Sequence, residues 1–160
     1  GLIEVALGLR KLLELLELPS VVKTSGQKGI HVLIPLAPGH TPPQAHALAE
    51  QLAKMIAEAL PAIACTTHDK LIRKGRLFVD HLQNFTGKTL VLPYSLRAND
   101  GACVSAPVRW DEVTPKLNPA AFNLKTIHAR LAAVGDLAAG LIAGKAQLGP
   151  VLERLGLRVR

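Results

Sequence analysis

The hydrophobic positions of the first eighteen residues repeat every three to four residues. Apolar side chains recur through Leu2–Leu18 with charged residues between them, and this spacing places one apolar stripe along a helix. A second helix is predicted to begin after Thr41, because Thr41-Pro42-Pro43-Gln44 combines a capping box with proline in the first helical turn. We expect this helix to reach Leu60 and to end at Pro61.

Short apolar or β-branched runs outside these helices predict strands. Val21–Ser25 and His31–Leu36 flank a turn with two glycines, which favours a strand pair. Alternation predicts a strand over Arg76–Leu82 with Asp80 and His81 on opposite faces. The remaining expectations are strands at Thr89–Tyr94 and Val104–Trp110, helices at Pro119–Gly135 and Leu137–Ala146, a break at Gly149-Pro150, and a frayed tail at Arg158–Arg160.

Helices and strands thus alternate along the chain. This order predicts a mixed α/β (α+β) fold, with one sheet flanked by helices. With 160 residues, 49% of them hydrophobic and 19% charged, the chain is long enough to bury one core without covalent staples. We therefore expect a single domain over residues 1–160.

The cysteines and the apolar runs exclude several protein classes. Cys65 and Cys103 support neither a disulfide framework nor the paired spacing of a zinc site, which favours a cytosolic protein. No apolar run reaches the roughly 18 residues of a membrane span, and charges interrupt the apolar N-terminal stretch. We expect a cytoplasmic protein without a signal peptide or a membrane anchor.

Net charge suggests the kind of partner. The chain has 19 Lys and Arg against 12 Asp and Glu, a formal charge of +7, which suits a polyanion. Aromatic residues make up 3% of the chain, too few for stacking platforms along a single strand. Contacts with nucleic acid are therefore expected to be phosphate-directed. Many basic domains bind no nucleic acid, so charge alone does not assign this function.

The densest candidate chemistry lies in Lys23–Val32. Two glycines flank Gln27-Lys28, so backbone N–H groups can approach an anion there. Ser25, Lys28 and His31 add hydroxyl, ammonium and imidazole donors. The segment is a candidate triphosphate clamp, although it lacks the spacing of a P-loop. An ordinary β-turn with a solvated Lys28 explains the same residues, and the spacing leaves both interpretations open.

Two further blocks carry candidate chemistry. In residues 70–84, four cations within seven residues precede Asp80. A carboxylate at the end of an apolar strand beside such cations suits a metal ligand next to a phosphate-binding surface. A solvated basic turn with Asp80 in an ion pair is the alternative. In the third block, Pro93–Ala98, Arg97 can fork onto phosphate oxygens as it leaves a buried strand.

Together the three blocks match known motifs in residue type and order. The matching residues are Ser25-Gly26-Gln27-Lys28-Gly29-Ile30-His31-Val32, Lys70-x-x-Arg73-x-Gly75-Arg76-x-Phe78-x-Asp80-x-Leu82-Gln83-Asn84, Tyr94-Ser95-x-Arg97-Ala98, Val104-Ser105-x-Pro107 and Trp110-Asp111-Glu112-Val113. The chain resembles the polymerase domain of bacterial ligase D, of the archaeo-eukaryotic primase superfamily, which serves non-homologous end joining. The resemblance extends from the first helix to the region of Gly135-Asp136.

The resemblance implies a DNA-repair nucleotidyltransferase with polymerase and primase activity. It implies template-directed nucleotide addition with a divalent metal, manganese being favoured over magnesium. It assigns the nucleotide's phosphates to Ser25, His31 and, as a helper, Lys28, and the catalytic metal-binding carboxylate to Asp80. It also places three side chains along the nucleotide and phosphate site, namely Arg73, Gln83 and Arg97. We expect Ser25, His31, Asp80 and Arg97 to converge around one bound triphosphate.

Partners follow from the same resemblance. They are nucleoside triphosphates, DNA ends or gapped duplexes, a ligase and an end-binding protein, in the bacterial cytoplasm at the nucleoid and away from membranes. The sequence departs from the family at two points. Asn99-Asp100 stands where a second basic residue is usual, which predicts a weaker phosphate clamp, and His81 replaces a common tyrosine.

The family's Asp-x-Asp motif precedes the helix that begins here at Leu2, and this chain starts at Gly1. Asp80 alone cannot hold two divalent ions, so we expect nucleotide binding without catalysis by this chain alone. A missing strand would also expose a sheet edge, which favours a homodimer or a piece of a longer polymerase. The alternatives are a non-catalytic nucleotide- or DNA-binding module, an inactive folded remnant, and a metal-independent enzyme using Cys65 or Cys103.

Overall fold

The computed structural model describes residues 1–157, and their contacts divide into two compact units. Unit 1 comprises residues 1–18, 36–90 and 145–157. Unit 2 comprises residues 19–35 and 91–144. The single domain predicted over residues 1–160 therefore stays a prediction, and the predicted tail Arg158–Arg160 lies outside the described residues.

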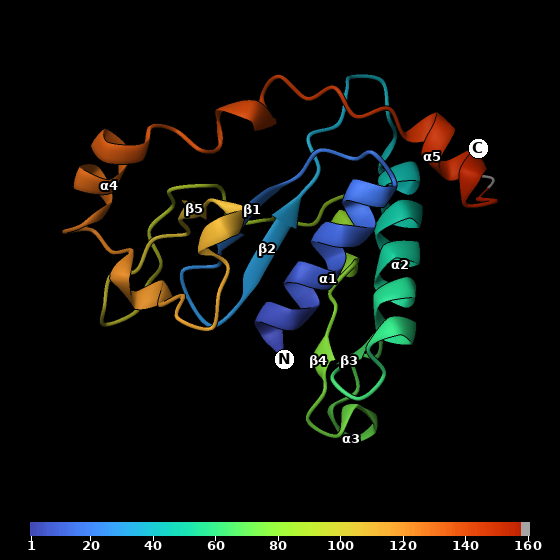
Figure 1. Cartoon of the computed structure of the whole chain (residues 1–160), viewed down its shortest axis with the longest axis horizontal. Coiled ribbons are helices and arrows are strands. Elements are labelled where there is room, and N and C mark those ends of the chain that lie inside the picture. Colours follow the sequence, from blue (N-terminus) through green and yellow to red (C-terminus); the bar gives the residue numbers. More distant parts are fainter. Residues whose placement is uncertain (158–160) are drawn as a thin grey trace. The chain divides into compact units, whose positions relative to one another are not determined.

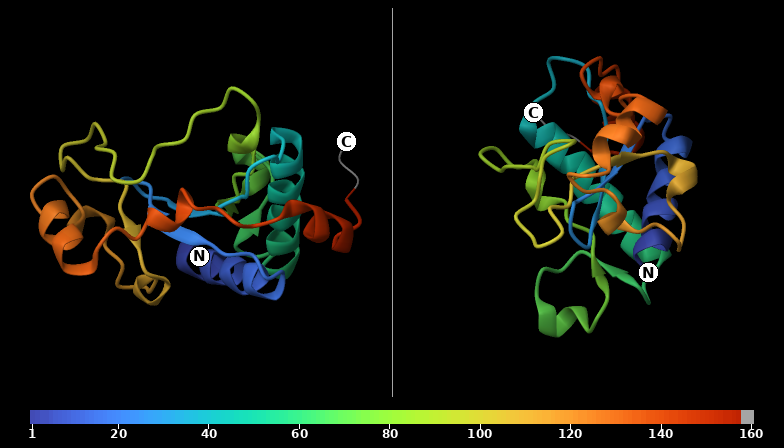
Figure 2. Two further views of the ribbon diagram at one scale, coloured as in Figure 1. Left: turned by 90° about the horizontal axis from the view of Figure 1, so that it is seen from above. Right: turned by 90° about the vertical axis from the view of Figure 1, so that its left-hand side faces the viewer.

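Three helices form the body of unit 1. Helix α1 (Leu2–Leu15) and helix α2 (Pro42–Ala59) contact each other, as the two views of Figure 2 also show, and α5 (Leu148–Arg154) packs on α2. The predicted capping box is present, because Thr41 Oγ1 accepts from Gln44 N while the Gln44 side chain accepts from Thr41 N. Within residues 1–157, no helix has both the length and the apolar character that crossing a bilayer requires.

The last helix corrects one expectation. Gly149-Pro150 was expected to break the chain's final element, yet α5 runs through both residues. Pro150 is the third residue of this helix, where the missing N–H has no intrahelical acceptor in any case. A proline in the first turn therefore fits a helix start better than a helix end.

Two short parallel strands complete unit 1. β3 (Ala64–Cys65) pairs with β4 (Leu77–Phe78), and the short helix α3 (Lys70–Arg73) lies between them in the chain. The strand predicted over Arg76–Leu82 is thus mostly wrong, because its only partner, β3, has two residues. Asp80 and His81 lie beyond the strand, and alternation does not place them on opposite faces. The 3-10 helix η1 (Leu82–Asn84) follows directly.

Unit 2 contains a three-stranded sheet in the order β2-β1-β5 (Figure 1). β1 (Val21–Thr24) and β2 (Ile30–Leu33) form the predicted antiparallel pair, and β1 also pairs antiparallel with β5 (Pro107–Val108). The register sets Lys23 opposite His31. These findings confirm a mixed α/β fold with helices and small sheets.

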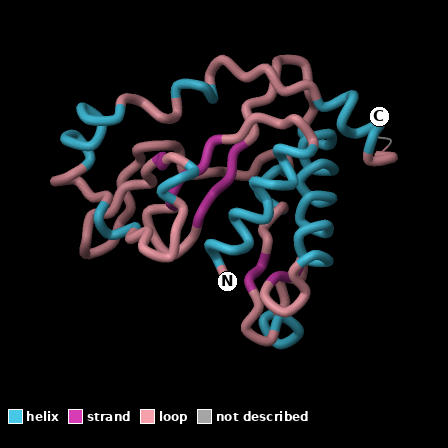
Figure 3. Tube along the Cα trace, viewed as in Figure 1, coloured by secondary structure: helices cyan, strands magenta, loops and turns pink. Residues whose placement is uncertain are grey.

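The later part of unit 2 is more irregular than predicted, as the long loop segments of Figure 3 show. The strand predicted at Thr89–Tyr94 is wrong, since only an isolated bridge from Leu96 to Val104 forms near it. The predicted helices shrink to short elements, which are η3 (Pro119–Ala121), α4 (Ile127–Val134) and η4 (Ala139–Leu141). The 3-10 helix η2 (Trp110–Glu112) forms where no helix was predicted.

Side-chain oxygens explain where α4 begins. Asn123 Oδ1 accepts from Lys125 N, and Thr126 Oγ1 accepts from Asn123 N. Such local bonds offer the backbone an alternative to the helix. The helix predicted from Pro119 therefore starts only at Ile127, whose side chain joins the unit 2 core with Val104 and Ala106.

Candidate functional site

Ser25 closes the turn between β1 and β2. Its N–H donates to the carbonyl of Gly29 at 2.9 Å, and its Oγ accepts from the N–H groups of Gln27 at 3.2 Å and Gly29 at 3.0 Å. The turn itself uses these two N–H groups, while the expected approach of backbone N–H groups to an anion stays a prediction. What the turn offers outward is the proton of the Ser25 hydroxyl and the exposed side chain of Lys28.

Arg97 lies directly against this turn. A Cβ added at Gly26 would sit 2.4 Å from Arg97 Cγ and 3.1 Å from Ser105 N, so only glycine leaves room for the arginine stem. Gly26 also has φ +70°, which favours glycine. Arg97 N donates to the carbonyl of Cys103 at 2.8 Å, which fixes the backbone on the other side. The structure thus brings Arg97 and the Ser25–Gly29 turn together.

Asn99 joins the same two segments. Its Nδ2 donates to the carbonyl of Gly26 at 3.0 Å, and its Oδ1 accepts from Cys103 N at 3.0 Å. In the sequence, Asn99 was interpreted only as the loss of a basic residue that is usual in the family at this point. In the structure the amide replaces that charge with two hydrogen bonds that hold the Arg97 segment on the turn.

A buried lysine lies beside His31. Lys23 Nζ is 2.9 Å from His31 Nδ1 and 2.6 Å from Ser105 Oγ, and the lysine has no exposed surface. Burial, together with the neighbouring charge of Arg97, lowers the pKa of Lys23 to about 8. Sequence reasoning missed both Lys23 and Ser105. The sequence did hold a signal for Lys23, because counting residues outward from the turn along both strands pairs Lys23 with His31.

The predicted residues of unit 1 form two groups. Asp80 Oδ1 accepts from Leu82 N at 2.9 Å and Oδ2 accepts from the Gln83 side chain at 3.4 Å, so Asp80 and Gln83 share one exposed turn. The predicted ion-pair alternative for Asp80 finds no partner among the ion pairs described for residues 1–157. This carboxylate instead bonds within its own turn.

Aromatic packing fixes that turn to α2. The ring of His46 stacks on Phe85 with centroids 3.8 Å apart and lies 5.3 Å from the ring of His81. Burial, with the charge of His46 adding to it, holds the pKa of His81 below its ordinary value. Asp80 therefore protrudes from a turn whose neighbouring side chains are anchored.

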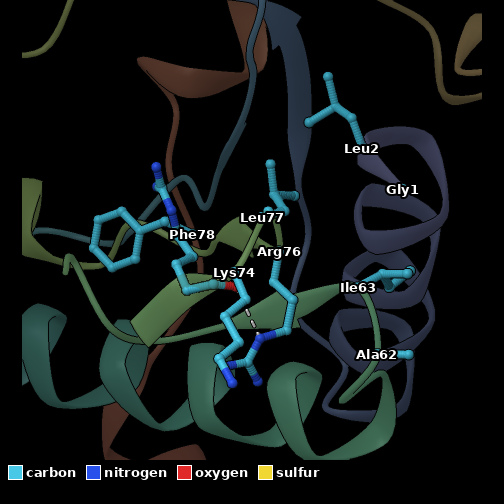
Figure 4. Close-up of a pocket in the computed structure, with 10 residues that line it drawn as sticks. Gly1, Leu2, Ala62, Ile63, Lys74, Arg76, Leu77 and Phe78 are labelled. Atoms are coloured by element: carbon cyan, nitrogen blue, oxygen red, sulfur yellow. Dashed lines mark hydrogen bonds between the residues drawn. The ribbon is translucent and has the colours of Figure 1, made fainter. Parts of the chain in front are cut away.

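Arg73 lines a separate basic cavity of about 480 Å³ (Figure 4). Arg73 O accepts from Arg76 Nε at 3.1 Å, and the Arg76 guanidinium also reaches the carbonyls of Pro61 and Ile72. Lys74, Phe78 and Gly1 line the same cavity, whereas Asp80 and Gln83 do not. Arg76 thus braces the C-terminal end of α3, which carries Arg73.

The predicted site residues are divided between the two units. Ser25, Lys28, His31 and Arg97 belong to unit 2, while Arg73, Asp80 and Gln83 belong to unit 1. The contacts within unit 2 place Arg97 beside the turn that carries Ser25 and Lys28, and the charge of Arg97 acts on Lys23, the partner of His31. The predicted convergence of Asp80 with this group stays a prediction.

The described side chains do not form a complete divalent-metal site. In residues 1–157 no group of three or more His, Cys, Asp or Glu side chains is arranged to hold a metal ion. Both oxygens of Asp80 already accept hydrogen bonds. Two divalent ions need several converging carboxylates, so the residues present do not fit a two-metal centre.

Comparisons with known proteins follow the same motifs. The family model described as the LigD primase-polymerase domain matches residues 1–138. The multifunctional non-homologous end joining protein LigD of Mycolicibacterium smegmatis is 37% identical over 155 residues, covering 96% of this chain and 20% of that protein. The bifunctional LigD of Bacillus subtilis is 35% identical over 130 residues, covering 81% of this chain and 21% of that protein.

A solved structure agrees. The polymerase domain from Mycobacterium tuberculosis ligase D in complex with DNA matches with a TM-score of 0.83 and 37% identity, over 89% of this chain and 49% of that chain. This chain therefore spans about half of that solved domain and about a fifth of the curated relatives. Because the family model covers most of the sequence, the chain belongs to the LigD primase-polymerase domain family.

Proposed function

We propose that this chain supplies the nucleotide- and phosphate-binding part of a LigD-type nucleotidyltransferase that works in end-joining DNA repair. The family match and the relatives named for non-homologous end joining support this function. The observation within the chain that carries it is the contact of Arg97 with the Ser25–Gly29 turn. That contact puts the stem of Arg97 against the turn that carries the Ser25 hydroxyl and the exposed side chain of Lys28.

The proposed roles follow from the chemistry of each side chain. Ser25 and His31 donate hydrogen bonds to the phosphates of the incoming nucleotide, with Lys28 as a mobile helper charge. The planar guanidinium of Arg97 binds two phosphate oxygens at once. Arg73 and Gln83 are proposed as further residues of the nucleotide and phosphate site, as the resemblance implies.

The polymerase family uses divalent metal ions. We propose that Asp80 holds such an ion in this chain, with manganese favoured over magnesium. Magnesium demands near-ideal octahedral geometry and dehydrates reluctantly. Asp80 as the one predicted ligand would hold it weakly. The described residues do not fit a two-metal centre, so Asp80 is proposed as a metal ligand and not as part of a complete catalytic centre.

The proposed partners are nucleoside triphosphates and DNA ends or gapped duplexes, in line with the DNA-bound structural relative and the charge of +7. A ligase and an end-binding protein would act on the same DNA end, in the bacterial cytoplasm at the nucleoid. Self-association through an exposed sheet edge is proposed as well, with β2 at one edge of the described sheet.

Nucleotide binding tests the central claim. We expect ATP, titrated into the chain in a calorimeter, to bind about tenfold more weakly to Arg97→Ala, because a hydrogen-bonded charge contact is lost. Lys125→Ala is the matched control, since it removes an exposed cation of unit 2 that lies outside the turn. Equal affinities for Arg97→Ala and Lys125→Ala would refute the assignment.

A non-catalytic binding module is the second candidate function, favoured by the incomplete ligand set around Asp80. Primer extension with manganese on a gapped duplex separates the two. Extension that disappears in Asp80→Ala establishes catalysis by this chain. Two results together establish the binding module. The chain does not extend the primer, and a plot of log K for DNA binding against log salt concentration has a slope of about −0.9 per neutralised phosphate.

A further inference from the structure

A buried polar chain runs from Lys23 in two directions within unit 2. Lys23 Nζ contacts His31 Nδ1 at 2.9 Å on β2 and Ser105 Oγ at 2.6 Å. Ser105 Oγ in turn donates to the carbonyl oxygen of Thr24 at 2.9 Å. Lys23, Thr24 and Ser105 have no exposed surface, so water does not replace the Lys23–Ser105 and Ser105–Thr24 bonds, while the Lys23–His31 bond is partly buried.

The chemistry of the ammonium group fixes the direction of every bond. A protonated lysine has three N–H donors and no acceptor. Toward Lys23, therefore, His31 Nδ1 accepts, and the proton of the neutral ring resides on Nε2. The Ser105 hydroxyl accepts from Lys23 and gives its own proton to the Thr24 carbonyl, which leaves the lysine as the donor to both neighbours.

Arg97 and His31 face Lys23, and the like charge of Arg97 works against the protonation of Lys23. Arg97 approaches from the segment before β5 and His31 from β2, and no ion pair described for residues 1–157 joins Lys23 to a carboxylate. A pKa of about 8 leaves Lys23 mostly protonated at neutral pH. A buried cation 2.9 Å from Nδ1 also disfavours a second proton on His31, because like charges repel strongly at low dielectric.

We propose that Lys23 is a positioning residue that holds His31 in its neutral form with the proton on Nε2, so that the imidazole presents an N–H donor to a phosphate oxygen of the bound triphosphate. The proposal rests on the proposed nucleotide function and specifies how His31 serves it. Lys23 is buried and acts through His31 without contacting the nucleotide itself.

The unmodified protein provides the first test. Nitrogen-15 NMR of the histidine rings, with His31 identified by its absence from the spectrum of His31→Ala, reports which ring nitrogen carries the proton. We expect His31 at pH 7 to be neutral and protonated on Nε2. A ring protonated on Nδ1, or on both nitrogens, overturns the proposal. This result does not depend on whether any Lys23 variant folds.

ATP affinity in a mutant cycle provides the second test. We expect Lys23→Met to weaken binding about tenfold at pH 7, and to cause no further loss when His31 is already alanine. An equal loss in both backgrounds overturns the proposal, because Lys23 would then act independently of His31. Unchanged ATP binding by His31→Ala alone refutes the proposed nucleotide role of His31, and the inference with it.

The pH dependence separates positioning from a purely structural role. As pH rises through about 8, Lys23 loses a proton and can accept a hydrogen bond from Nδ1–H, which releases the tautomer. ATP affinity of the unmodified chain is therefore expected to fall between pH 7 and 9, while that of Lys23→Met stays flat. Parallel profiles for the two proteins would overturn the proposal.

Discussion

Replacing Gly26 by alanine is the perturbation whose cost the structure defines most directly. The added Cβ would lie 2.4 Å from Arg97 Cγ, about 1 Å closer than ordinary van der Waals contact, and 3.1 Å from both Ser105 N and the carbonyl carbon of Val104. The backbone atoms belong to the segment that pairs with β1 and cannot easily move. The arginine stem must therefore yield.

Two costs add at this position. An L-residue at φ +70° costs about 1–2 kcal/mol, and pushing Arg97 off its rotamer costs about 0.5–1.5 kcal/mol. Together they predict a loss of about 1.5–3.5 kcal/mol in the free energy of unfolding. For a chain of this size each kcal/mol lowers the melting temperature by about 2–4 °C, so we expect a drop of about 3–14 °C by calorimetry.

A matched variant isolates the clash from the backbone strain. Gly156 has φ +68° and no atom within 4 Å of an added Cβ, so Gly156→Ala should show the strain alone and leave ATP affinity unchanged. Gly26→Ala should also weaken ATP binding, because it displaces Arg97. Combining Gly26→Ala with Arg97→Ala should restore about 1 kcal/mol of the lost free energy of unfolding. A Gly26→Ala protein no less stable than Gly156→Ala, with ATP affinity intact, would refute the proposed packing.

Three other changes test parts of the fold. Glu112→Gln removes a bidentate ion pair with Arg130 at 2.7 and 2.9 Å. Urea titration should show the free energy of unfolding lowered by about 1–2 kcal/mol at pH 7. Because the side-chain hydrogen bonding with Arg130 holds the pKa of Glu112 below its ordinary value, this deficit should fade as pH falls through the lowered pKa of the folded state. Leu13→Ala, at a side chain 1% exposed, should cost about 3 kcal/mol by the same assay, and full stability would contradict the packing of α1. Thr41→Ala should cost about 1 kcal/mol by removing the α2 cap, and an unchanged melting temperature would show that the capping box contributes nothing.

Sequence reasoning succeeded where a signal was local. The period of α1, the Thr41 capping box and the glycine turn between β1 and β2 each involve residues close in the chain, and the structure confirms the elements they predict. The signal failed where an element depended on a distant partner. The length of β4 is limited by its two-residue partner β3. The residue pattern within Arg76–Leu82 holds no information about that partner.

The same distinction applies to the candidate site. The resemblance supplied its residues, and the turn chemistry of Ser25 follows from its neighbours. The contact of Gly26 with Arg97 joins positions 71 residues apart, and Ser105 reaches Lys23 across 82 positions. Spacing along the chain carries no information about either contact, so the supporting contacts of Lys23, Asn99 and Ser105 emerged only from the structure.

The candidate residues of the two units differ in how far function and stability can be separated. In unit 2 the bonds that hold the sheet together also hold the site, because Thr24 Oγ1 and Ser105 Oγ join β1 to the segment before β5 while Lys23 supports His31. Substitutions there should lower affinity and stability together. In unit 1, Asp80 and Gln83 are exposed and bond mainly to each other and to their own turn. A charge at such a position contributes little to folding, so a strong functional effect of Asp80→Asn at unchanged melting temperature would mark that carboxylate as a group kept for its chemistry.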